Sequence, residues 1–402
     1  MNSLPMVTLS LILLLFLSAP VAYLMLLALA SARPPKSNRT ERREPKSRFI
    51  IAIPAHDEEN VIGATVRRLR SLDYPENLYS IHVVADYCSD RTAEVARQAE
   101  AVVHERNEGP RTGKGAALSW LFRKVLAEFP ADGVVVFDAD TRVDSQFLRE
   151  MDARLSQGDR AIQGQHIISN PHMGWFPALT WAMFLVDNRF QNLGRSNLGW
   201  SAKNMGDSIC FRADVLRELG WGEGLTEDYQ FRQKLLLHGI RIVYEPAAKG
   251  YGEAPLTWLQ ARAQRARWLR GTRDASRQLA KSLIVEAIKR GDWALFDGAL
   301  QANLPSYSTL TIVSLAILVI HLVVQFFVPV FPWSLLAGWA AIVALLFFYP
   351  LVGLLFENAP LKAYFAILTG PIFIVWRTWL AMNARFGKSP VTWIRTAHGG
   401  QN

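Results

Sequence analysis

Cysteine is scarce in this sequence: its 402 residues include only two, Cys88 and Cys210. A disulfide framework, which holds many small secreted domains together, is therefore not expected. The spacing of the two cysteines also matches no metal-binding motif. At this length the chain is long enough for more than one domain.

Charged side chains are absent from long segments at both ends of the chain. Met6–Ala30, Leu304–Phe331 and Ser334–Phe356 contain no Asp, Glu, Lys or Arg. About 20 such residues in a helix span the hydrocarbon core of a bilayer, so all three are predicted to be transmembrane. Ala363–Ala381 is similar but contains Arg377. An Ala-Ser-Ala sequence after the first segment resembles a processing site, but the segment is long for a signal peptide and no basic residue precedes it.

Basic residues flank these segments unevenly. None precedes the first, whereas Arg33–Arg48 is rich in arginine and lysine, so the positive-inside rule places the large middle section in the cytoplasm. The loop Val328–Trp333 has no basic residue and is expected outside, and the basic tail is expected inside. Three crossings already return the chain to the cytoplasm at Glu357. Ala363–Ala381 is therefore expected to lie in the interface or to re-enter, unless one of the predicted spans is wrong.

The net charge of +9 could indicate a nucleic-acid partner. Because the basic residues gather beside the predicted membrane segments, attraction to anionic lipid headgroups explains the excess, and no nucleic acid is expected. Between Arg262 and Lys281, basic residues also recur every three or four positions with apolar residues between them. This pattern is typical of an amphipathic helix on a membrane surface.

The middle of the chain alternates short apolar runs with helical patterns. Phe49–Ile53, Ile81–Val84 and Val134–Phe137 are apolar without alternation, as expected for strands covered on both faces. Helix-like spacing follows at 61–72, 92–99 and 116–129. This order predicts an α/β domain, with an open, mostly parallel sheet and helices on both faces.

Acidic residues follow all three predicted strands. The first is followed by Pro54-Ala-His-Asp-Glu-Glu59, the second by Asp86-Tyr-Cys-Ser-Asp90 and the third by Asp138-Ala-Asp140. Each could be an ordinary turn or helix-cap residue. In open α/β sheets, however, ligands bind at the carboxyl ends of the strands, and like charges gathered there repel unless a cation joins them.

Asp138 and Asp140 form an oxygen-only pair, which suits a hard cation such as Mg2+ or Mn2+. Mg2+ commonly takes one or two protein carboxylates and completes its shell with substrate phosphates and water. We therefore predict that the pair holds a metal that also holds a diphosphate. Lys114, in Arg111-Thr-Gly-Lys-Gly115, could add positive charge there, although its glycines also fit an ordinary loop and the spacing is not that of a P-loop.

Five motifs occur in a familiar order: Pro54-Ala-His-Asp-Glu58, Asp86 after a strand, Asp138-Ala-Asp140, Thr226-Glu-Asp228 and Gln264-Arg-Ala-Arg-Trp268. The series resembles the inverting, GT-A-fold family 2 glycosyltransferases, in the membrane-bound branch that includes cellulose, hyaluronan and chito-oligosaccharide synthases. Two further stretches, 193–199 and 205–211, look most like bacterial exopolysaccharide enzymes of the methanolan type. Asp207 and Ser208 depart from that pattern, in which a small neutral residue and a glycine are expected, and this leaves acceptor binding open.

The resemblance implies a role for each matching residue. For the nucleotide-sugar, it implies Asp86 at the uracil ring with Ala55 and Glu58 nearby, and Asp138 and Asp140 at the diphosphate, the latter through the metal. Asp228 would be the general base. The remaining residues would lie at the donor and acceptor: Glu227, Gln264, Arg267 and Trp268.

The required chemistry is compatible with these roles. Displacing a nucleoside diphosphate from an anomeric carbon needs an acceptor hydroxyl that is deprotonated as it attacks, and cations to neutralise the departing charge. One carboxylate on the face opposite the leaving group then gives inversion. Asp228 also precedes a helix-like segment, where an acidic side chain is stabilising on dipole grounds alone. Trp268 could stack on a sugar or anchor at the membrane interface.

The expected architecture is therefore an α/β GT-A domain, Rossmann-like with a mostly parallel sheet, inserted between an N-terminal transmembrane helix and a C-terminal helical membrane region. Along the chain we expect a transmembrane helix at 1–32, a basic cytoplasmic linker at 33–48, the GT-A domain at 49–262, interfacial amphipathic helices at 263–303, transmembrane or re-entrant helices at 304–384, and a basic cytoplasmic tail at 385–402.

Three functions fit this architecture. The leading hypothesis is a multi-pass enzyme of the inner (plasma) membrane that transfers sugar from a UDP-sugar to a growing exopolysaccharide or related glycan at the cytoplasmic face. The second transfers one sugar to a lipid acceptor, either a polyprenyl-linked saccharide or a glycolipid. The third, a non-enzymatic scaffold, predicts eroded acidic motifs, and these are intact. Self-exporting synthases tend to have more membrane helices, which favours a separate export system or a lipid acceptor.

Overall fold

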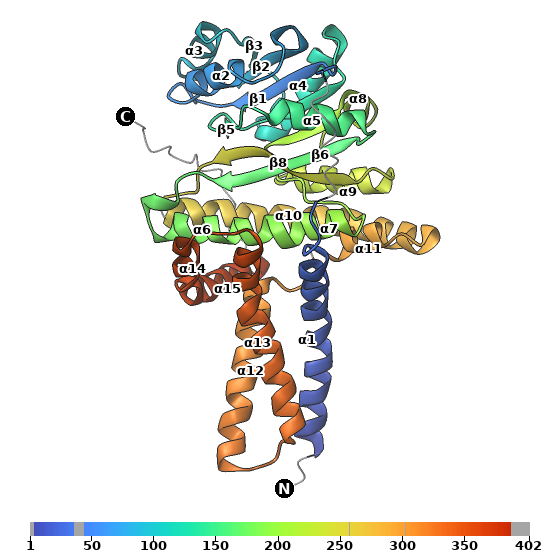
Figure 1. The fold of residues 1–402 in the computed structure, drawn as a ribbon, viewed down its shortest axis with the longest axis vertical. Coiled ribbons are helices and arrows are strands. Elements are labelled where there is room, and N and C mark those ends of the chain that lie inside the picture. The colour runs from blue at the N-terminus through green and yellow to red at the C-terminus, as the bar shows by residue number, and fades with distance from the viewer. Residues whose placement is uncertain (1–3, 36–43, 257, 302, 387–402) are drawn as a thin grey trace.

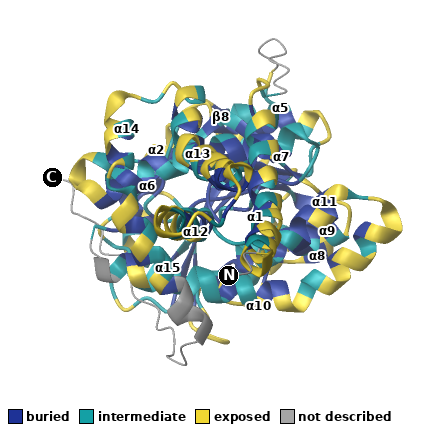
Figure 2. Ribbon diagram, turned by 90° about the horizontal axis from the view of Figure 1, so that it is seen from below, coloured by how far each residue is buried: buried dark blue, intermediate teal, exposed yellow. Residues whose placement is uncertain are grey.

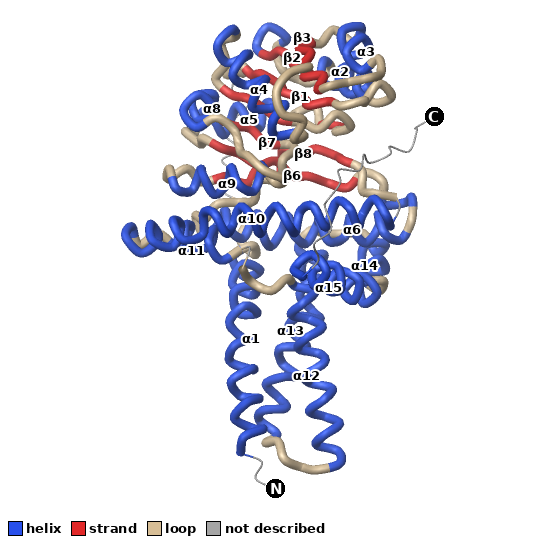
Figure 3. The backbone as a smooth tube through the Cα atoms, turned by 180° about the vertical axis from the view of Figure 1, so that it is seen from behind, coloured by secondary structure: helices blue, strands red, loops and turns tan. Residues whose placement is uncertain are grey.

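The computed structural model describes residues 4–35, 44–256, 258–301 and 303–386. Most of the expected basic tail, and part of the expected basic linker, lie outside the described residues. The described chain forms three layers: an α/β domain, a layer of long helices beneath it, and a stalk of helices on the far side (Figures 1 and 3).

The α/β domain is built on an eight-stranded sheet in the order β3-β2-β1-β4-β7-β6-β8-β5. Its strands are β1 (Phe49–Ala55), β2 (Tyr79–Asp86), β3 (Val102–Arg106), β4 (Gly133–Val136), β5 (Arg142–Val143), β6 (Ala161–Ile168), β7 (Ile209–Arg212) and β8 (Ile242–Gly252). Strands β3, β2, β1 and β4 pair in parallel, as do β6 and β8, whereas β7 runs antiparallel to both β4 and β6 and β5 runs antiparallel to β8. The expected mostly parallel sheet is confirmed.

Two hydrophobic cores cover the faces of this sheet, because successive strand residues point to opposite sides. Ile50 and Val134 belong to the core beneath α4 (Lys114–Glu128), whereas their neighbours Ile51 and Val135 belong to the core beneath α2 (Ile62–Arg70). The other helices of the domain are α3 (Thr92–Gln98), α5 (Phe147–Ser156), α8 (Ala213–Leu219) and α9 (Glu227–Leu237). The unbroken apolar runs of the sequence are thus strands buried on both sides.

A layer of helices lies between the sheet domain and the stalk (Figure 1). It consists of α6 (Trp175–Val186), the π-helical η3 (Asp187–Leu193), α7 (Gly194–Asn197), α10 (Trp258–Arg290) and α11 (Trp293–Leu300), with short 3-10 turns η1 (Glu76–Leu78) and η2 (Pro171–Met173) elsewhere in the domain. The continuous helix α10 crosses position 262/263, where the sequence placed a domain boundary. It contacts α9, α11 and α15 (Gly370–Phe386).

The stalk contains α1 (Leu4–Ala30), α12 (Tyr307–Phe327) and α13 (Trp333–Phe356). Among the described residues, these three helices are long and apolar enough to cross a membrane. Many residues of these helices are exposed (Figure 2), and the exposed apolar side chains include Phe16, Phe326 and Phe348. Inside the stalk, the Ser10 hydroxyl lies 2.6 Å from His321 Nε2 and 3.0 Å from Trp339 Nε1, which joins all three helices.

The uncertain segment Ala363–Ala381 forms two helices, α14 (Leu361–Ile367) and α15, bent by 50° at a short break. By length and composition, the bent pair fits either a broken span or a re-entrant loop. Both lie against the underside of the helical layer, beside the top of the stalk (Figure 1). The expectation that this segment does not cross as a simple helix stays a prediction.

Candidate functional site

A large cavity of about 1720 Å³ begins at the carboxyl ends of β1, β2 and β4 and continues down to α12, α13 and α15. All the site residues nominated from the sequence line it: Ala55, Glu58, Asp86, Lys114, Asp138, Asp140, Glu227, Asp228, Gln264, Arg267 and Trp268. They come from segments more than 200 residues apart, and the parallel strands bring the first of them to one sheet edge. The structure therefore gathers these residues around one space.

The acidic turn after β4 is held from below by a third carboxylate, that of Asp207. Its Oδ1 accepts hydrogen bonds from the Asp138 backbone N–H (3.0 Å) and the Thr141 hydroxyl (2.8 Å), and its Oδ2 lies 2.7 Å from His166 Nδ1. Burial raises the pKa of Asp207, but His166, Lys114 and the Asp138 N–H together outweigh it and hold the pKa at about 2. Asp207 is thus an ionised support for the Asp-x-Asp turn.

Lys114 is the first residue of α4 and reaches the same turn. Its Nζ forms an ion pair with Asp138 and donates to the Gly206 carbonyl at 2.5 Å. Burial lowers the pKa of Lys114, but Asp138 and Glu227 outweigh burial and raise it above its ordinary value. The ammonium therefore stays charged next to the acidic pair, as expected for a group that would face a diphosphate.

The donor set of this turn fits a hard divalent cation. Asp138 keeps 43 % of its side chain exposed, and both it and Asp140 face the cavity with oxygen ligands only. Lys114 already occupies one oxygen of Asp138, which shows that the position attracts a cation. Asp138 and Asp140 are thus suited to hold Mg2+ or Mn2+ together with substrate phosphates.

Asp86, at the end of β2, is oriented by a partner that the sequence did not reveal. Arg106 at the end of β3 forms a buried ion pair with Asp86 and donates to the Pro110 carbonyl at 2.7 Å. Arg106 and Arg111 also lie over the ring of Tyr87, at 5.4 and 4.4 Å from its centroid. The Asp86 carboxylate therefore lines the cavity in a fixed position.

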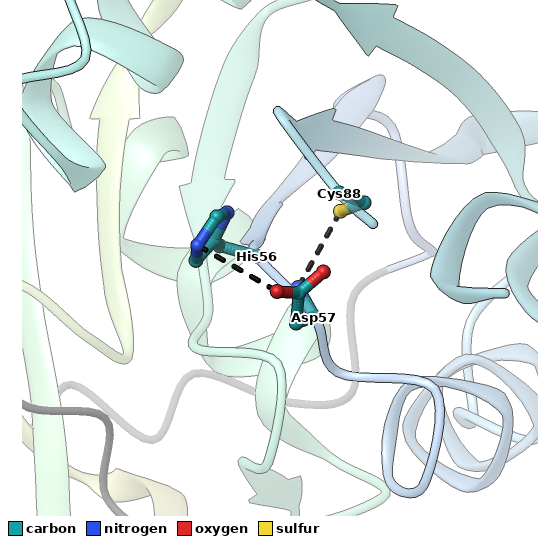
Figure 4. A group of neighbouring side chains, drawn as sticks. All are labelled: His56, Asp57 and Cys88. Carbon is teal, nitrogen blue, oxygen red and sulfur yellow. Dashed lines mark hydrogen bonds and ion pairs between the residues drawn. The ribbon is translucent and has the colours of Figure 1, made fainter. Parts of the chain in front are cut away.

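A second possible metal group lies beside this edge and consists of His56, Asp57 and Cys88 (Figure 4). Its geometry indicates a structural clamp. The Asp57 Oδ1 accepts the Ser89 backbone N–H at 2.6 Å, and His56 Nδ1 lies 2.6 Å from the Asp86 carbonyl. Burial also raises the pKa of the Cys88 thiol, which disfavours the thiolate that metals bind. The group ties the loop after β1 to the loop after β2.

Glu227 and Asp228 begin α9 and point into the cavity. Burial raises the pKa of Asp228, and the Tyr229 N–H, Lys114 and Arg267 offset only part of this effect. Burial and the neighbouring Asp228 raise the pKa of Glu227 to about 7. Gly206 has φ +74°, and a Cβ there would lie 3.1 Å from Asp228 Oδ2. The Asp228 carboxylate thus lies against the loop that Lys114 contacts.

The motif on α10 forms part of the cavity wall. Gln264, Arg267 and Trp268 line it, and Arg267 acts electrostatically on both Glu227 and Asp228. The helix approaches the loop before α9 closely, since a Cβ on Gly271 would lie 2.6 Å from the Thr226 hydroxyl. The two helices thus bring the proposed base and the Gln-x-x-Arg-Trp motif together.

Three comparisons bear on what such a site is for. Residues 45–271, more than half of the chain, match the family described as glycosyltransferase like family 2. The chain belongs to this family. Its place in the branch of methanolan-type enzymes stays a prediction.

Two curated relatives match part of this glycosyltransferase. The chain is 27% identical over 254 residues to a probable glycosyltransferase, YdaM, of Bacillus subtilis, covering 59% of this chain and 57% of that protein. It is 29% identical over 239 residues to the beta-monoglucosyldiacylglycerol synthase of Synechocystis, covering 56% of this chain and 48% of that protein. The chain thus spans about half the length of the curated relatives it matches.

A solved structure resembles nearly the whole glycosyltransferase. The mannosyltransferase PcManGT of Pyrobaculum calidifontis, in complex with GDP-Man and Mn2+, is 17% identical with a TM-score of 0.55. The match covers 92% of this chain and 96% of that one. This likeness confirms the expected GT-A fold with apolar helices at both ends.

The sequence missed several residues that shape this site. Asp207 was visible only as a departure from the family pattern, and His166 and Arg106 carried no signal. Each lies on a strand or loop that enters the site through the sheet topology. Asp207 could have been found by asking what would hold two adjacent aspartates in a fixed turn.

Proposed function

We propose that this glycosyltransferase transfers a sugar from a UDP-sugar to a hydroxyl of a lipid acceptor, with inversion, at the cytoplasmic face of the plasma membrane. The observation that carries the proposal is the continuity of the cavity. Its lining includes Asp228 at the start of α9 and apolar side chains of the membrane helices, so one cavity reaches both.

The chemistry would be divided among residues of this chain. Asp228 is proposed as the general base, because its raised pKa makes it a stronger base than an ordinary carboxylate. Asp86 is proposed to bind the uracil ring, near Ala55 and Glu58. A divalent cation held by Asp138 and Asp140 would neutralise charge on the departing diphosphate. Lys114 and Arg267 would add to this neutralisation from the two sides of the cavity.

The lining of the lower cavity favours a lipid over a growing exopolysaccharide. The membrane helices contribute apolar side chains to it, among them Leu310, Leu315, Val343, Phe347, Ile374 and Val375. A polysaccharide presents many hydroxyls, and burying them against such side chains without hydrogen bonds is unfavourable. An acyl or prenyl chain is stabilised there by burial. The relative named as a glucosyldiacylglycerol synthase supports the same choice.

The test is to incubate membranes that contain the full-length chain with a panel of radiolabelled UDP- and GDP-sugars. We expect label from a UDP-sugar in the organic-solvent extract, and its loss when EDTA removes divalent ions. Asp228→Asn should lower the rate about a hundredfold or more, the usual contribution of a general base. A ladder of water-soluble polymer would contradict the lipid acceptor, and an active Asp228→Asn variant would contradict the base.

A further inference from the structure

Two arginines from different helices face the middle of the cavity, between the acidic site and the membrane helices. Arg265 lies on α10 directly after Gln264, and Arg377 lies on α15. Both line the cavity, and both are half-buried. The Arg265 guanidinium lies 5.0 Å from the centroid of the Trp268 ring and 5.8 Å from that of Phe373.

Neither arginine has an acidic partner within the part of the chain that the structure describes. No hydrogen bond or ion pair joins either guanidinium to a described residue. The acidic group that acts on both is Asp187, and its two oxygens accept from Lys203 Nζ at 2.6 and 2.8 Å. Burial and the neighbouring Arg377 lower the pKa of Arg265, but a guanidinium remains charged at neutral pH.

Such an arrangement is unfavourable for the empty protein. Two like charges that are half-buried repel each other, and both lose part of their hydration without gaining a counter-ion among the described residues. The guanidinium fork matches the oxygens of a phosphate group in a bidentate way, so a phosphate between the two arginines would relieve both effects.

The surroundings of the pair indicate what the phosphate is attached to. Below the arginines, the cavity continues along Leu315 of α12 and along Leu368, Ile374 and Val375 of the bent helix pair. Above them, Arg265 lies beside Trp268, which lines the cavity next to the acidic site. A ligand in this position would therefore carry an apolar chain on one side of its phosphate and a polar group on the other.

We propose that Arg265 and Arg377 bind the phosphate of an anionic membrane lipid, whose apolar chain lies along α12 and α15 and whose headgroup hydroxyl reaches Asp228. The inference rests on the proposed function and names the class of its acceptor as a phosphate-bearing lipid. The site is separate from the cations proposed for the donor: Lys114 and Arg267 act electrostatically on Glu227 and Asp228, whereas the acidic group that acts on Arg265 and Arg377 is Asp187.

The test uses the full-length protein in dodecyl maltoside and two lipids that differ only in the phosphate, dioleoyl phosphatidic acid and dioleoylglycerol. Native mass spectrometry measures how much of each lipid the protein retains. We expect selective retention of phosphatidic acid, lowered about tenfold or more by Arg265→Gln or Arg377→Gln. Arg277→Gln, which removes the same charge from an exposed position on α10, is the matched control and should retain the lipid.

The melting temperature distinguishes a role of the two arginines in lipid binding from a role in stabilising the fold. Without lipid, Arg377→Gln should leave the melting temperature unchanged or raise it, because it removes an uncompensated charge. A fall of several degrees, or unchanged lipid retention in both arginine variants, would overturn the proposal. Displacement of the lipid by equimolar inorganic phosphate would assign the pair to a soluble ion and would also overturn it.

The proposed function and this inference fail in different ways. Asp228→Asn should retain phosphatidic acid fully, while the two arginine variants should still bind the UDP-sugar, as measured by calorimetry. If Asp228→Asn stays active, the base assignment fails and the lipid site stands. If phosphatidic acid is not selected over dioleoylglycerol, the lipid site fails and the sugar transfer stands.

Discussion

The junction of α1, α7, α9 and α11 and the arginine pair of the cavity treat buried charge in opposite ways. At the junction, Arg195 and Arg232 share the carboxylate of Asp297, with each nitrogen 3.0 Å from an oxygen, and all three side chains are at most 1 % exposed. The Tyr23 hydroxyl of α1 donates to the same carboxylate at 2.5 Å. In the cavity, Arg265 and Arg377 have no such carboxylate between them among the described residues.

The same contrast holds for buried acids. Burial raises the pKa of Asp297, but Arg195 and Arg232 outweigh it and lower the pKa below its ordinary value. Glu227 is buried to a similar extent, and its pKa is raised to about 7. The difference separates charges that stabilise the fold from charges that can bind a substrate. Arg195, Arg232, Arg265 and Arg377 all line the cavity, so the two groups differ in their partners. Arg195 and Arg232 share a carboxylate that helps join α1, α7, α9 and α11, whereas Arg265 and Arg377 have none among the described residues and are available to a substrate.

Removing the shared carboxylate of the layer should have the largest effect. Asp297→Asn would leave two buried guanidiniums with a neutral partner, and breaking a buried pair in this way destabilises a protein by about 3–5 kcal/mol. Unfolding by denaturant in detergent measures the loss. The matched control is Asp292→Asn at the start of the same helix, because Asn still caps α11 and only the exposed Arg241 pair is lost, worth about 1 kcal/mol or less. If Asp297→Asn and Asp292→Asn lower the free energy of unfolding equally, the buried pairs of Asp297 contribute no more to stability than the exposed pair of Asp292.

Glu227 in the cavity should make the free energy of unfolding depend on pH, with an effect of intermediate size. Since the pKa of Glu227 is about 7 in the folded protein and 4.5 for an ordinary glutamate, the native state holds this proton more tightly than the unfolded state does. Its contribution to stability is therefore complete below pH 4.5 and is lost as the pH rises through 7. Glu227→Gln should remove this fall, which is about 3 kcal/mol.

Thermal unfolding of the two proteins between about pH 5 and pH 8 in detergent, a range that spans the raised pKa, checks this prediction. Glu218→Gln, at an exposed position of α8, should leave the pH dependence of the parent unchanged. If Glu227→Gln loses stability with pH as steeply as the parent does, the raised pKa of Glu227 is not the cause.

The two kinds of buried charge differ in how visible they are in the sequence. Strands such as β1 and β4 follow from apolar runs, and the acidic residues after them converge because parallel strands end at one edge. The fold and the acidic end of the cavity could therefore be predicted. The surroundings of Asp297 and Arg377 could not, because they depend on how α10, α11 and α15 pack, which no local pattern records. The bend between α14 and α15 was likewise visible only as a conflict in the number of membrane crossings.

The comparison can be sharpened by giving the cavity arginines the partner that they lack. Ile374 lies three residues before Arg377 on α15 and lines the same cavity. Residues at this spacing are neighbours on a helix surface, so Ile374→Glu would place a carboxylate beside Arg377, whereas Ile374→Gln would place a neutral side chain of equal length there. We expect the glutamate variant to retain phosphatidic acid about tenfold less than the glutamine variant, since the carboxylate competes with the phosphate for the same guanidinium.

The stability of the two variants completes this test. The glutamate variant should melt at a temperature equal to or above that of the glutamine variant, because the new ion pair turns the cavity arginine into one that resembles Arg195. Among the effects of Asp297→Asn, Glu227→Gln and Ile374→Glu on stability, that of Ile374→Glu should be the smallest. The new ion pair stays partly hydrated, and such pairs contribute about 1 kcal/mol or less. Identical lipid retention in the two variants would show that the apolar chain alone selects the ligand, and that the missing carboxylate has no role in binding.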